Sequence, residues 1–96
     1  MNDALFTNSG TFQVVAPNGS ITSTGTSTFN NLSGATVSIR ELDLPPTGTF
    51  ALNNANTAAG SALVTALNMS GGSFSSGGVG PTAITTATVT GTGDFS

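Results

Sequence analysis

Turn-forming residues interrupt this chain at short intervals, and the segments between them are rich in Val, Ile, Thr and Phe. Such segments fit a pleated, half-buried surface. The pattern therefore predicts an all-β chain, which we expect to form a small antiparallel sandwich or barrel of short strands joined by long Gly/Ser/Asn-rich loops. A length of 96 residues allows one domain at most.

Alternation of apolar and polar residues predicts strands over residues 11–16, 20–29, 35–44 and 47–53, and a last strand that begins at Pro81. Residues 61–69 fit a helical spacing as well as period 2, and we favour a strand because glycines bracket the segment. Pro17, Asn18 and Gly19 favour a tight turn. In residues 35–44 the inward face changes phase at Arg40 and Glu41, which indicates a β-bulge with one extra residue.

We expect a single β domain over residues 1–96, with a flexible N-terminal arm over about residues 1–10 and a flexible glycine-rich loop over residues 70–80. Phe74 is one of two large apolar residues in that loop. No segment repeats at a fixed period of 20 to 50 residues, so the sequence does not predict a solenoid.

Charged residues are scarce, with one basic and four acidic side chains, no His and no Cys. Nucleophilic catalysis by Ser or Thr needs a neighbouring base, and no His or Lys is present to act as one. Glu41 and Asp43 lie two residues apart on one strand face, so they share one environment, which does not suit an acid and base pair. We expect no enzyme activity, no cofactor and no metal site, and we interpret Arg40, Glu41 and Asp43 as a polar cluster at a subunit contact.

The same composition indicates which partners to expect. A single Arg and a net charge of -3 argue against phosphate contacts with nucleic acid. No stretch approaches the length of a membrane span. With neither disulfides nor a His/Cys metal site as a staple, oligomerisation is the remaining usual means of stabilisation.

Threonines alternate along two of the predicted strands, which places their side chains on one face of each. The first row is Thr22, Thr24, Thr26 and Thr28, and the second is Thr86, Thr88, Thr90 and Thr92. Such rows are either the solvent face of a strand or a flat array that packs on another subunit. Their spacing resembles that of β-solenoid antifreeze proteins, and the resemblance implies ice binding.

Cytosolic synthesis, low charge and the lack of catalytic groups together fit a virion component. In length and β-rich character the whole chain resembles the small head decoration, or cement, proteins of tailed bacteriophages. The resemblance implies a structural protein of the virion that is made in the host cytoplasm. It also implies binding to copies of itself, with a trimer favoured, and to a major capsid protein. We expect Phe6, Phe12 or Phe74 to act as apolar anchors at these contacts.

Two alternative functions stay open. The first is an extracellular filament subunit or adhesin of β-solenoid type, in which neighbouring chains stack their strands end to end. The second is an ice-binding protein that uses its threonine rows. The threonine rows, the three phenylalanines and the Arg40, Glu41 and Asp43 cluster are the candidate interface residues.

Overall fold

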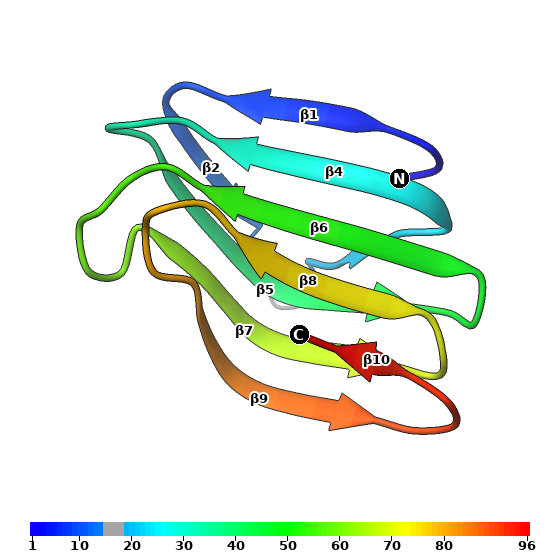
Figure 1. The fold of residues 1–96 in the computed structure, drawn as a ribbon. Coiled ribbons are helices and arrows are strands. Elements are labelled where there is room, and N and C mark those ends of the chain that lie inside the picture. The colour runs from blue at the N-terminus through cyan, green and yellow to red at the C-terminus, as the bar shows by residue number, and fades with distance from the viewer. Residues whose placement is uncertain (15–18) are drawn as a thin grey trace.

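The computed structural model describes residues 1–14 and 19–96 as strands joined by turns and short coil segments (Figure 1). The expected turn at Pro17 and Asn18, and the last two residues of the first expected strand, lie outside the described residues. Among the described residues no helix is long and apolar enough to cross a membrane. The strands are Leu5–Asn8 (β1), Thr11–Val14 (β2), Ile21–Thr22 (β3), Gly25–Asn31 (β4), Thr36–Leu44 (β5), Gly48–Asn54 (β6), Ala62–Met69 (β7), Ser73–Gly77 (β8), Ala83–Val89 (β9) and Asp94–Phe95 (β10).

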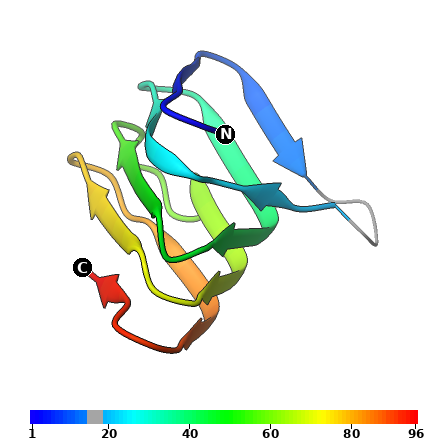
Figure 2. The same cartoon turned by 90° about the vertical axis from the view of Figure 1, so that its right-hand side faces the viewer.

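The strands form two sheets in which each paired neighbour runs parallel. One sheet has the order β1-β4-β6-β8-β10, and the other has the order β2-β5-β7-β9 with β3 also beside β5. Figure 2 shows the chain passing from one sheet to the other and back in successive coils. The protein is thus a β-solenoid of about 4 turns, and the expected antiparallel sandwich or barrel was wrong.

This correction has a simple physical cause. A hairpin pairs consecutive strands in antiparallel fashion, whereas parallel partners need a long connection between them. Here each connection consists of the turn, the strand of the opposite sheet and a second turn. The local pattern of alternation is the same in both arrangements, so it predicts the strands without their direction.

The number of residues in one coil differs from coil to coil, and this difference hides the repeat in the sequence. Asn8, Asn31 and Asn54 occupy one row and are separated by 23 residues. Asp43 and Asn68 lie side by side with a separation of 25 residues, and Asn68 and Thr88 with 20. The coils therefore have no fixed length, although strand pairing keeps their residues in register.

Apolar side chains fill the space between the sheets in rows that run across the coils. Leu42 and Leu67 face each other in one row, and Phe50 stacks on Phe74 with a 6.1 Å separation of ring centroids in another. These four side chains have no solvent exposure. Because a parallel sheet places each inward residue directly over its counterpart, the core extends as far as the rows do.

Asparagines make a buried ladder along one edge of this core. Asn8 Nδ2 donates to Asn31 Oδ1 over 2.9 Å, and Asn31 Nδ2 donates to Asn54 Oδ1 over 2.9 Å. Asn54 Nδ2 completes the ladder by donating to Ser61 Oγ and to the Pro81 carbonyl. Each amide also bonds to backbone at the turn beside it, so the ladder holds the turns of neighbouring coils in alignment.

The phase change at Arg40 and Glu41 is a corner of the sheet. Ile39 pairs with Val64 and Glu41 pairs with Ala66, so one residue lies between these pairs on each strand. The expected β-bulge, with one extra residue on one strand, is therefore wrong. Both strands turn two consecutive side chains outward at the same level, and this bends the sheet while its pairing stays regular.

Two segments that we expected to be flexible contain strands. Residues 5–8 of the expected arm form β1, which pairs with β4. Residues 73–77 of the expected loop form β8, which pairs with β6, and Phe74 is fully buried there. The sequence did not reveal this strand because Phe74 is its one large apolar residue, and the Ser and Gly residues around Phe74 give no alternating pattern.

Candidate functional site

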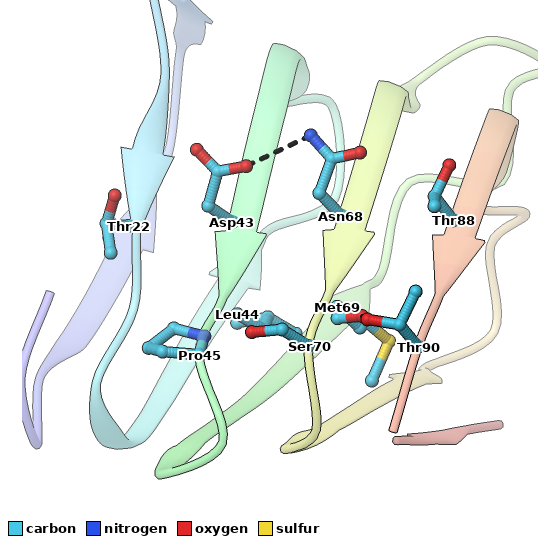
Figure 3. A pocket seen from close by; sticks show the side chains of 9 residues that line it. All are labelled: Thr22, Asp43, Leu44, Pro45, Asn68, Met69, Ser70, Thr88 and Thr90. Atoms are coloured by element: carbon cyan, nitrogen blue, oxygen red, sulfur yellow. Dashed lines mark hydrogen bonds between the residues drawn. The ribbon is translucent and has the colours of Figure 1, made fainter. Parts of the chain in front are cut away.

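A row of polar side chains crosses the outer face of the second sheet (Figure 3). Thr22 of β3 pairs with Asp43 of β5, Asp43 pairs with Asn68 of β7, and Asn68 pairs with Thr88 of β9. The four residues line a groove of about 280 Å³ together with Pro45, Ser70 and Thr90. We call this the polar groove.

The polar groove has donors and acceptors but few groups that could do chemistry. Asn68 Nδ2 donates to Asp43 Oδ1 over 3.0 Å, and the threonine hydroxyls flank this pair. Among residues 1–14 and 19–96, no group of three or more His, Cys, Asp or Glu side chains is placed to hold a metal ion. A lone carboxylate beside an amide and hydroxyls suits hydrogen bonding to a surface or to water.

The charged cluster lies beside the polar groove at the sheet corner. Arg40 Nε donates to the Gly19 carbonyl over 2.9 Å, and its guanidinium lies 3.8 Å from the Glu41 carboxylate. Hydrogen bonding to Asp43 raises the pKa of Glu41 above its ordinary value of 4.5, and the negative charge of Asp43 and burial raise it further, whereas the charge of Arg40 lowers it. Because this ion pair is partly exposed, it adds little to stability.

We expect the substitution Asp43→Asn to lower the pKa of Glu41, because it replaces the carboxylate that accepts a hydrogen bond from protonated Glu41 and repels its ionised form. A raised pKa in the folded state adds stability below pH 4.5 that is lost as the pH rises through the folded-state pKa, so the variant should lose this acid-side contribution. An NMR titration of the Glu41 carboxyl carbon measures the change. Asp94→Asn is the control, and an unchanged Glu41 pKa in Asp43→Asn would contradict this assignment.

A second candidate site is the N-terminal end of the coil stack. Met1, Ala4, Phe6, Phe12, Ile21 and Phe29 are among the residues that line a hollow of about 410 Å³ there. The rings of Phe6 and Phe29 stack at 4.9 Å, and Phe12 packs edge-on against both. Phe6, which lies in the core row of Phe29, is 38% exposed, so this end of the core faces solvent. Leu5 lies on the outer face and is 71% exposed.

The C-terminal end of the stack also exposes apolar residues. Val89 is 43% exposed and Phe95 47% exposed, although both lie in the rows of buried core residues. Phe95 stacks on Phe74 with 5.6 Å between ring centroids. Both ends therefore present a strand edge with open backbone groups above an apolar interior.

The threonine rows do not form the two flat arrays that their spacing suggested. Thr22 belongs to β3 of the second sheet, whereas Thr26 and Thr28 belong to β4 of the first, and the chain turns between them at Thr24. Thr86 and Thr88 lie on β9, and Thr90 and Thr92 lie beyond its end. The fold instead brings Thr22 of the first row together with Thr88 and Thr90 of the second in the polar groove.

The expected aromatic anchors have different places. Phe6 and Phe12 lie together at the N-terminal end, where Phe6 is partly exposed. Phe74 is buried in the core and has no surface to offer a partner. Sequence reasoning missed Asn68, which has no local signal, and Phe95, whose row position follows only from the pairing of β10 with β8.

Comparison of the chain with protein-family models, with curated proteins and with solved structures found no match.

Proposed function

We propose that this protein is a structural subunit that associates end to end through its open strand edges, as in a β-solenoid filament or adhesin. The single observation that carries the proposal is that both ends of the coil stack expose apolar core positions, with Phe6 at one end and Val89 and Phe95 at the other. Burial of such residues at a contact stabilises an assembly. Pairing between the edge strands of two molecules would add each subunit along the axis of the coil stack.

Low charge supports the same function. The outer face of the first sheet carries short uncharged side chains over its central strands, such as Thr28, Ala51 and Ser75 in one row. Edge-to-edge association is normally discouraged by charges on or beside an edge strand. Of the edge strands, β1, β2 and β9 carry no charged residue, whereas β10 carries Asp94, so most of the open edge lacks this protection.

We expect the chain to form rods of variable length as its concentration rises, which light scattering after size-exclusion chromatography and electron microscopy can follow. Ala87→Lys should raise the concentration needed by at least about tenfold, because an inward ammonium on β9 would be buried unpaired at the contact. Thr88→Lys is the matched control, since its side chain points outward. A monomer at every concentration would overturn the proposal.

The other two functions predicted from the sequence give different results in the same experiments. A closed trimer that stays the same size on dilution and concentration would favour the capsid decoration protein. A clear thermal hysteresis with a monomeric protein would favour ice binding.

A further inference from the structure

Residues that pair across neighbouring coils form a row, and the rows show which residues of the first and last coils are equivalent. Met1 donates its amino group to the Thr22 carbonyl and Asn2 bridges to Thr24, so Met1 lies over Ser23. Ser23 lies in the row of Leu44, Met69 and Val89. Met1 and Val89 thus belong to the same row at opposite ends, and residues 1–88 span a whole number of coils.

The segment 89–96 lies in the same rows as the segment 1–5, with Val89 equivalent to Met1, Asp94 to Asp3 and Phe95 to Ala4. Asp94 pairs with Ser73 in the row of Thr49 and Thr26, where Asp3 also lies. Phe95 pairs with Phe74 in the row that leads back through Phe50 and Ser27 to Ala4. If a second copy continued the coil without a gap, its residues 1–5 would need the place that residues 89–96 occupy.

Three inward rows fit one another across such a joint. Ile84 would face Val14 of the second copy, Ala87 would face Ile21, and Ser76 would face Phe6. In the last two pairs a small side chain meets a large one, which is the alternation that fills a core without voids. Ala4 of the second copy would cover Phe74 in place of Phe95.

Segment 89–96 is held by a small set of contacts. Its backbone bonds join Thr90 to Met69, Asp94 to Gly72, and Ser96 to Phe74 and Ser76. Release of segment 1–5 would instead remove the Ala4 N–H that donates to Ser27 Oγ, and Ser27 is buried. Because a buried hydroxyl without a partner is costly, segment 89–96 is the one that leaves.

We propose that the N-terminal end of a second copy docks onto β8 and β9 in this register and displaces segment 89–96, which therefore acts as a removable stop to growth. The inference rests on the proposed end-to-end function and specifies its joint. Incoming residues 1–5 restore strand pairing to β8, so the exchange replaces one set of backbone bonds with another.

A disulfide that pins the stop tests the proposal in the full chain. Ser73 and Asp94 are paired neighbours, and the chain has no other cysteine, so Ser73→Cys with Asp94→Cys should form one bridge. Thr26→Cys with Thr49→Cys is the matched control, because it bridges β4 to β6 in the same row without touching the stop. Light scattering compares each variant oxidised and reduced.

We expect the oxidised Ser73→Cys, Asp94→Cys variant to need at least about tenfold more protein for assembly than its reduced form, and the control to be unaffected by oxidation. Phe95→Ala should lower the concentration needed, since it weakens the stop. Equal assembly of the oxidised and reduced forms would contradict the proposal that segment 89–96 limits growth, but it would not contradict end-to-end association. Absence of assembly in every form, including Phe95→Ala, would overturn both.

Discussion

Asn54→Ala is expected to lower the free energy of unfolding by about 3 kcal/mol, because it removes four hydrogen bonds, two buried and two partly buried, and such bonds are worth roughly 0.5–1.5 kcal/mol each. The Asn54 amide accepts from Asn31 and from the Asn56 backbone, and it donates to Ser61 and Pro81. Its loss takes one partner from each of these groups, although Asn31 Nδ2 still donates to the Ala35 carbonyl and Ser61 Oγ to the Asn56 carbonyl. Denaturant unfolding followed by far-ultraviolet circular dichroism measures the change.

Asn53→Ala is the matched control for this prediction. The Asn53 side chain points outward and donates to Asn30 on the neighbouring strand, so water can replace its partner. We expect a loss below about 1 kcal/mol. Equal destabilisation by the two substitutions would show that the buried ladder has no special part in stability.

Gly78→Ala should destabilise the protein by roughly 2–5 kcal/mol through a clash and a strained backbone together. Gly78 occupies the place that follows Asn54 in the asparagine row and has a φ of 86°. A Cβ atom there would lie 2.3 Å from the Asn54 carbonyl oxygen. The same denaturation experiment measures the effect.

Gly34→Ala separates the two causes. Gly34 has a φ of 82°, yet a Cβ atom at Gly34 would meet nothing within 4 Å. The control therefore has the backbone cost without the clash, about 1–2 kcal/mol. If Gly78→Ala cost no more than Gly34→Ala, the close approach of coils at Gly78 would be refuted.

Local sequence predicted several strands well. The expected strands at 35–44, 47–53 and 61–69 correspond to β5, β6 and β7, because their alternation reports which side chains face the core. The segment 20–29 was expected to be one strand, but it forms β3 and β4 in different sheets. Alternating threonines look the same on both sides of a turn, so the pattern could not reveal the break.

The candidate site was less predictable than the strands. Asp43 stood out in the sequence because charges are rare, and Thr22 and Thr88 stood out because they alternate. Their common place in the polar groove depends on coils of unequal length, which bring residues 20 to 25 positions apart into register. Only the pairing of whole strands fixes that register, and no short stretch of sequence contains it.

The one-way donation from Asn8 to Asn31 to Asn54 has an electrical consequence. Each carboxamide dipole points its positive end toward the last coil, so the three dipoles add along the axis of the molecule. Two molecules that met at unlike extremities would have aligned dipoles, whereas two that met at like extremities would have opposed ones. The interior of the protein thus favours a chain of molecules that all point the same way.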